Sequence, residues 1–204
     1  LVTSSETGHG IADLRAEINQ AFTDLVLPGN AGFDFRFTRS YNSKGPERWR
    51  VGPGFIRHAD SGETPAQNPR IVTPDGGVQR TFQAGADSPI FRTLSYWEYD
   101  RDTHELRLPN GVAYEYECAR TSRNTRYPTT ARDPFGNTIT FSYDSCEPNA
   151  ADEPLLESVS QDLGNGQVRT VTFGYLDGRV RTMTYEGREW KYTWEGSFLK
   201  EVTP

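Results

Sequence analysis

Residues 133–144, DPFGNTITFSYD, contain a turn followed by a strictly alternating strand. Asp133 to Asn137 supply residue types that favour a tight turn, because short polar side chains bond to the local backbone and glycine accepts positive φ. Behind the turn the residues divide between two faces of a strand: Ile139, Phe141 and Tyr143 on one, Thr138, Thr140 and Ser142 on the other. This stretch predicts one half of a β-hairpin.

The same pattern recurs in GQVRTVTFGYLDG at residues 166–178 and in GREWKYTWEG at residues 187–196. Each copy begins at a turn glycine and continues as an alternating strand. The strand ends on two aromatic residues separated by one other residue, and an acidic residue and the next turn follow. An internal repeat of this kind governs the fold prediction. We therefore predict an all-β protein, a curved antiparallel sheet of successive β-hairpins, with these turn positions: Gly136, Asn137, Gly166, Gly178 and Gly187.

The alternating aromatic residues predict a ladder of rings across neighbouring strands. Good cross-strand aromatic pairs each stabilise a sheet by about 0.2–1 kcal/mol. The composition agrees, because 12% of the 204 residues are aromatic whereas the total hydrophobic content is only 34%. The predicted ladder, which is also a candidate binding platform, consists of Phe141, Tyr143, Phe173, Tyr175, Trp190, Tyr192 and Trp194.

The regular hairpins are expected over residues 108–204, after a less regular opening segment at 33–107 and an irregular lead-in at 1–32. Within the lead-in, ADLRAEINQAF (12–22) is a candidate short helix with weak caps, and TDLVLPG (23–29) predicts a short strand. FDFRFTRSY (33–41) alternates as a half-buried strand does.

These motifs resemble those of the YD-repeat, or Rhs-repeat, proteins. GNTITFSYD carries the family's closing Tyr-Asp, and NGQVRTVTFGYLDGR and EGREWKYTWEG are degenerate copies. FRFTRSYNS followed by VGPGF resembles the segment that opens such arrays. RIVTPDGGVQRTF and ELRLPNGVAYEY resemble the irregular strands that follow it. The resemblance covers about residues 23–200 and places this chain in the N-terminal portion of a repeat array.

The resemblance implies a structural function. Rhs proteins, the shell-forming components of bacterial Tc toxins and the animal teneurins wind hairpins into a spiralling sheet, which in bacterial members encloses a toxic polypeptide. We therefore expect a shell or scaffold segment of an exported bacterial protein, secreted or at the cell surface. It is expected to pair with further repeat chain or with another copy through exposed strand edges.

Chemistry is not expected from this chain. His9, His58 and His104 are far apart in sequence and are expected on the surface or in loops. Asp133, Asp144 and Glu195 recur at repeat boundaries, where turns use them, so a structural role is favoured over acid–base catalysis. We predict that the protein is not an enzyme and has no catalytic residue, no metal site and no cofactor.

Composition argues against two partners, nucleic acid and a membrane that the chain would span. The net charge is −6, without the concentrated basic face of a nucleic-acid-binding module. No apolar run approaches the roughly 20 residues that cross a bilayer. The competing hypothesis is an adhesion or carbohydrate-binding module that uses exposed aromatic residues to bind a glycan. Cys118 and Cys146 are either a disulfide or two free thiols, and a disulfide would indicate export.

Overall fold

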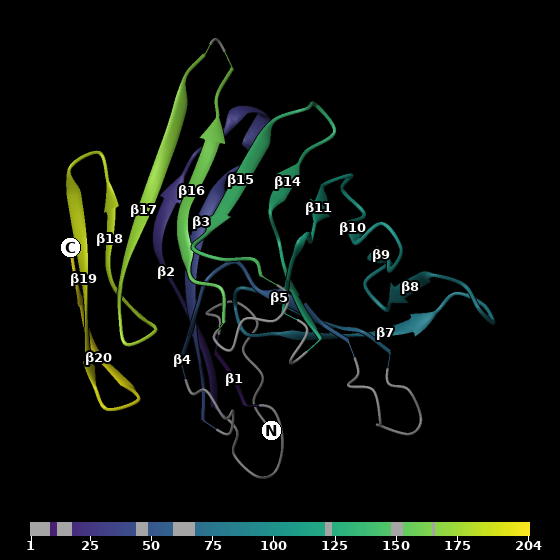
Figure 1. Cartoon of the computed structure of the whole chain (residues 1–204), viewed down its shortest axis with the longest axis horizontal. Coiled ribbons are helices and arrows are strands. Elements are labelled where there is room, and N and C mark those ends of the chain that lie inside the picture. Colours follow the sequence, from purple (N-terminus) through teal and green to yellow (C-terminus); the bar gives the residue numbers. More distant parts are fainter. Residues whose placement is uncertain are drawn as a thin grey trace.

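The computed structural model describes residues 9–11, 18–43, 49–58, 68–120, 124–147, 153–164 and 166–204. These residues form two antiparallel sheets (Figure 1). The smaller sheet contains β1 (His9–Ile11), β2 (Ile18–Leu27), β3 (Phe35–Asn42) and β4 (Trp49–Val51), with a 3-10 turn η1 (Asn30–Gly32) between β2 and β3.

The larger sheet has 16 strands. Their bounds are β5 (Phe55–Arg57), β6 (Arg70–Val72), β7 (Val78–Gln83), β8 (Ile90–Thr93), β9 (Glu98–Asp100), β10 (Glu105–Arg107), β11 (Ala113–Glu115), β12 (Cys118–Arg120), β13 (Thr125–Tyr127), β14 (Thr130–Arg132), β15 (Thr138–Tyr143), β16 (Leu156–Asp162), β17 (Val168–Leu176), β18 (Arg179–Tyr185), β19 (Arg188–Glu195) and β20 (Phe198–Thr203). Apart from η1, the described residues contain no helix, so the predicted all-β, hairpin-built fold class is confirmed.

Successive strands pair in sequence order from β5 to β11 and from β14 to β20. The hairpin β12–β13 leaves this order, because β13 pairs with β5 while β11 pairs directly with β14. Strand β7 turns the corner between the two parts of the sheet: Val78–Arg80 pair with β6, and Thr81–Gln83 pair with β8. In Figure 1, β7 accordingly lies roughly horizontally, whereas β14–β17 lie roughly vertically.

Two hydrophobic cores result from this arrangement. The first lies between the small sheet and the C-terminal hairpins, where Phe37 contacts Phe173 with ring centroids 4.6 Å apart. Figure 1 shows β2 and β3 behind β15 and β16. The second core lies where the sheet folds back on itself, and its buried residues are Ile56, Ile71, Phe91, Tyr99, Leu106 and Tyr116.

The candidate N-terminal helix is wrong for the part that can be compared. Residues 12–17 lie outside the described residues, but Ile18–Phe22 form the first half of β2. Residues 19–22 pair with β3 from Asn42 back to Arg39. A long antiparallel ladder against an aromatic-rich strand outweighs a local helix preference that had no good caps. Strand β2 therefore lies within the segment expected to be a lead-in.

No helix in the described ranges is long and apolar enough to cross a membrane.

Candidate functional site

The tight turns share one hydrogen-bonded geometry. In residues 133–137 the Asp133 N–H donates to the Asn137 carbonyl, and the Gly136 N–H donates to the Asp133 carbonyl, both at 3.1 Å. The same two bonds occur in residues 73–77, 93–97 and 108–112. Each is a three-residue hairpin loop between two bonded residues, and the third residue of the loop adopts positive φ. Gly76, Gly111 and Gly136 occupy that position with φ of 83°, 83° and 86°.

The side chain of Asp133 fixes the turn that precedes β15. Its Oδ1 accepts hydrogen bonds from the N–H groups of Phe135 and Asn137, and its Oδ2 accepts one from Asn137 Nδ2 at 2.7 Å. Burial alone would raise the pKa of Asp133, but the hydrogen bonds from Asn137, Phe135 and Gly136 outweigh it and lower the pKa below its ordinary value. The carboxylate is therefore occupied by the turn.

The other predicted turn glycines also lie between strands. Gly178 follows Asp177 in the β17–β18 turn, with φ of 72° and 52° respectively, and Gly187 follows Glu186 in the β18–β19 turn, with φ of 78° and 47°. Two consecutive positive φ angles are the pattern of the type I′ hairpin turn. Gly166, before β17, has φ of 74°.

The closing aromatic residue of each repeat is bonded to the backbone of the preceding strand. The Tyr143 hydroxyl donates to the Pro128 carbonyl at 2.9 Å, just before β14. The Tyr175 hydroxyl donates to the Leu156 carbonyl at 3.0 Å, at the start of β16. Trp194 Nε1 donates to the Val180 carbonyl at 2.8 Å, near the start of β18. We call these three bonds the aromatic tethers.

A β-bulge lies beside each tether. The pairing register shifts between Ser142 and Tyr143, between Gly174 and Tyr175, and between Thr193 and Trp194. A bulge bends its strand and increases the local right-handed twist. In each pair the extra residue lies in the following strand: Glu157 in β16, Arg181 in β18 and Lys200 in β20. The strand that follows each repeat is therefore bent beside the tethered aromatic residue.

The seven predicted ladder residues all belong to the first core. Phe141 and Tyr192 are buried in it, and the others are partly buried against it: Tyr143, Phe173, Tyr175, Trp190 and Trp194. The Tyr192 hydroxyl donates to Asp24 Oδ2 at 3.0 Å, and Asp24 also pairs with Arg39 at 2.9 Å. This polar group joins β19 to the small sheet.

The tethered rings line a cavity of about 200 Å³, which we call the aromatic cavity. It lies beside the link between β4 and β5, and six aromatic residues contribute to its wall: Trp49, Phe55, Tyr127, Tyr143, Tyr175 and Trp194. Three further lining residues are charged. The Arg50 guanidinium lies over the Phe55 ring at 5.2 Å and that of Arg179 over the Trp194 ring at 5.6 Å, and Glu153 is the third.

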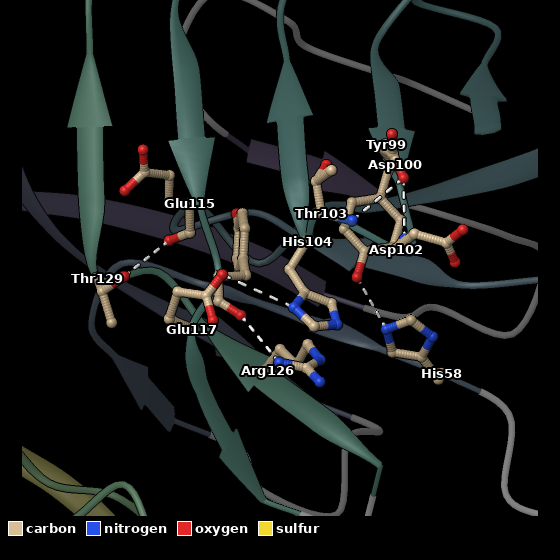
Figure 2. A network of polar contacts seen from close by, with 11 residues as sticks. His58, Tyr99, Asp100, Asp102, Thr103, His104, Glu115, Glu117, Arg126 and Thr129 are labelled. Atoms are coloured by element: carbon tan, nitrogen blue, oxygen red, sulfur yellow. Dashed lines mark hydrogen bonds and ion pairs between the residues drawn. The ribbon is translucent and has the colours of Figure 1, made fainter. Parts of the chain in front are cut away.

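A second group of polar side chains lies at the other core, on β9, on β13 and in the residue that follows β5 (Figure 2). His58 Nε2 and the buried Tyr99 hydroxyl share a hydrogen bond of 3.0 Å. His104 Nδ1 lies 3.7 Å from Glu117 Oε1, and Arg126 donates to the Tyr116 carbonyl at 3.3 Å. The structure thus brings His58 and His104 toward one cluster (Figure 2). Both lie outside strands, as expected of loop residues, and both are half-buried.

The charges around this cluster keep His58 neutral. Burial, followed by the positive charge of Arg126 and by His104 and Arg101, lowers the pKa of His58 to about 4. Burial also raises the pKa of Tyr99 well above its usual range. No group of three or more potential metal ligands occurs in the part of the chain that the structure describes. The hydrogen bond between the neutral His58 ring and the Tyr99 hydroxyl can therefore link the end of β5 to β9.

Cys118 and Cys146 form a disulfide with their Cα atoms 4.9 Å apart. Cys118 is fully buried in β12, and Cys146 lies in the loop after β15. The bond therefore links β12, the end strand of the 16-stranded sheet, to the loop between β15 and β16.

No protein-family profile and no curated protein matches this sequence. Solved structures show a distant likeness. The N-terminal domain of the effector protein SpvB from Salmonella typhimurium is 16% identical, with 76% of this chain and 73% of that chain covered and a TM-score of 0.46. For the TcdB2-TccC3 crystal structure, the identity is 12%, the coverage 93% and 13%, and the TM-score 0.47.

The Photorhabdus luminescens Tc holotoxin pore gives 15% identity, coverage of 78% and 11%, and a TM-score of 0.47. The chain thus spans 13% or less of these two Tc structures. With these TM-scores below 0.5, the proposed function rests on the geometry of this chain itself.

Proposed function

We propose that this chain is one arc of a structural wall of the YD-repeat type, which contributes to enclosing or displaying another polypeptide, such as a toxin, and which performs no chemistry itself. The observation that carries the proposal is the recurrence of one device: an aromatic tether at the end of β15, β17 and β19, each opposite a β-bulge in the next strand, β16, β18 or β20.

The recurrence has a mechanical consequence. Each bulge bends its strand, and the three bulges lie at equivalent ends of alternate strands in one sheet. Their bends therefore add along the sheet instead of cancelling. Each tether holds the strand opposite the bulge against the strand before it. A sheet extended by more copies of this device continues to curve, as the wall of a shell must.

The strand order supports a partner at β20. Within the described residues, β20 pairs with β19 and ends the order of the larger sheet. An edge strand presents backbone N–H and C=O groups that can pair with another strand. Further repeat chain, or a second copy of this chain, would continue the ladder there.

The disulfide favours an exported protein. Disulfides persist in oxidising compartments and are rare in reducing ones. A covalent link between β12 and the loop after β15 would therefore be maintained outside the cytosol. This agrees with the secreted or cell-surface location that the family resemblance implies.

Carbohydrate binding is the second candidate function, because six aromatic residues surround one cavity. Aromatic rings offer apolar faces against which sugar rings can pack. A glycan array probed with the folded chain tests this candidate. Saturable binding to one glycan class that is lost on filling the cavity would favour it over the wall.

Sedimentation velocity across a range of concentrations tests the wall proposal. We expect concentration-dependent association through β20, which Val202→Pro suppresses because the register places the Val202 N–H on the side away from β19, and proline removes this donor from the edge. Val202→Ala is the matched control, since it shortens the side chain and keeps the N–H. Circular dichroism checks that both variants retain the sheet. A chain that stays monomeric throughout, or associates equally well with Val202→Pro, would contradict the proposal.

A further inference from the structure

We infer that the aromatic cavity receives one aromatic side chain of an acidic polypeptide segment. This inference rests on the proposed function and names the class of partner that the wall would hold. Three properties of the cavity support it: its size, the state of the hydrogen-bonding groups on its rings, and the charges that line it.

The size suits one ring. The cavity has a volume of about 200 Å³, and an apolar protein cavity of about 150 Å³ is known to bind benzene. A phenyl ring therefore fits with little unfilled space. A second side chain, or a disaccharide, would have to extend into solvent.

The tethered rings offer faces and few donors. The hydroxyls of Tyr143 and Tyr175 and Nε1 of Trp194 already donate to backbone carbonyls. A sugar placed against these rings would bury hydroxyl groups that lose water, which is costly when the bonds are not replaced. An aromatic side chain gives up no such bonds and gains ring–ring contacts, which favour edge-to-face or offset arrangements.

The charged lining selects the neighbours of that side chain. Arg50 and Arg179 contribute two guanidinium groups and Glu153 one carboxylate. Because each guanidinium lies over an aromatic ring, its charge is held beside the cavity in a fixed place. A segment with carboxylates on either side of its aromatic residue is therefore complementary to this site.

Calorimetric titration with short peptides tests the inference. The probe is acetyl-Asp-Phe-Asp-amide, and we expect saturable binding to the folded chain. Acetyl-Asp-Ala-Asp-amide should bind at least about tenfold more weakly, because it lacks the ring whose burial provides most of the affinity. Acetyl-Asn-Phe-Asn-amide should bind about threefold to tenfold more weakly, since it lacks the charges.

Two variants locate the binding. Leu155→Trp fills the cavity with a larger side chain, while the Leu155 N–H keeps its bond to Asp144 Oδ1. It should abolish binding without loss of the sheet by circular dichroism. Arg50→Gln should weaken binding of the acidic peptide and leave the neutral one unchanged. Arg92→Gln, an exposed arginine of β8 paired with Glu98, is the matched control and should change neither.

Three results would overturn the inference: absence of saturable peptide binding, binding that Leu155→Trp leaves intact, or tighter binding of glucose or maltose than of the acidic peptide. Association through β20 is measured separately by the effect of Val202→Pro. If peptide binding fails while that variant still suppresses association, the cavity inference falls and the wall remains. If the peptide binds but the edge does not associate, the wall proposal falls.

Discussion

Asp133 and Gly136 carry most of the conformational information in the turn before β15. The aspartate accepts three hydrogen bonds from Phe135 and Asn137, and Gly136 supplies the positive φ that closes the loop. A carboxylate in this position needs no partner outside the turn. This local sufficiency explains why the stretch can be repeated along a chain.

Gly136→Val should destabilise the protein by about 1–3 kcal/mol. The φ of Gly136 is 86°, whereas a Cβ there would meet nothing within 4 Å, so the cost comes from the backbone alone. Gly85→Val is the matched control, because Gly85 also has open space around it and does not adopt positive φ. Thermal unfolding of both variants checks the prediction, and equal melting temperatures would show that the turn is wrongly assigned.

Tyr96 occupies the glycine position of the turn at residues 93–97, with φ of 61° and 85% of its surface exposed. The left-handed conformation costs a non-glycine residue about 1–2 kcal/mol. Tyr96→Gly should therefore stabilise the protein by about 0.5–1 kcal/mol, after the greater entropy of glycine in the unfolded chain is counted. Tyr96→Ala, which removes the ring and keeps the strained φ, should give no gain in melting temperature.

At the scale of elements, each aromatic tether links the end of one strand to the start of the strand before it. Tyr143 lies at the end of β15 and reaches back to Pro128 before β14, and Trp194 at the end of β19 reaches back to Val180 in β18. Each tether lies beside a bulge in the next strand, so the bond and the bend occur at the same place in the sheet.

Tyr175→Phe should cost about 0.5–1.5 kcal/mol, the usual net value of one hydrogen bond, because it leaves the ring in place and removes the bond to the Leu156 carbonyl. Tyr96→Phe provides the control, since that ring is exposed. Urea unfolding measures both. If Tyr175→Phe is as stable as the wild-type chain, the tether does not contribute to the fold.

The contact between β5 and β9 should make stability depend on pH. His58 has a pKa of about 4 in the folded protein, against about 6.5 when unfolded. The unfolded chain therefore takes up this proton first. The contribution of His58 is fully present above pH 6.5 and is lost as the pH falls toward 4.

His58→Phe keeps a ring against Tyr99 and cannot titrate, so the decline in stability between pH 6.5 and 4 should be smaller in this variant. Burial and Arg126 also lower the pKa of His104, so part of the decline should remain. Urea unfolding at several pH values gives the comparison. Equal declines in the two proteins would contradict the assignment of His58.

The elements that follow local rules could be predicted from the sequence. The strands that contain Phe141, Phe173 and Tyr192 were predicted by alternation between turn glycines. The turn at residues 93–97 could not, because TLSYW contains no glycine, proline or asparagine. The pairing of β13 with β5 and the contact of His58 with Tyr99 join residues far apart in sequence, for which no local pattern exists.

The same limit applies to the site. The closing aromatic residues could be identified from the sequence as a repeating feature. The backbone carbonyls to which their O–H and N–H groups donate could not be inferred from residue type, although these bonds give the rings a structural role. The aromatic cavity depends on Trp49 and Phe55, which belong to a segment of Gly and Pro that gave little signal. Only the packing of that segment against β15–β19 creates the concave surface.

At the scale of the whole molecule, the two hydrophobic cores hold together different parts of the fold. The first core fixes the small sheet on the curved C-terminal hairpins, and the second closes the folded-back part around Tyr99. The disulfide between Cys118 and Cys146 links these parts covalently. The result is a stable body from which β20 can extend the sheet.

Hydrogen–deuterium exchange on the associated chain tests the wall most directly, because it reports which backbone groups become paired. On association, the amides of residues 198–203 in β20 should become protected, while those of the β17–β18 turn at Asp177 and Gly178 should exchange as before. Protection confined to other surfaces, with β20 exchanging at the same rate in both states, would contradict the account.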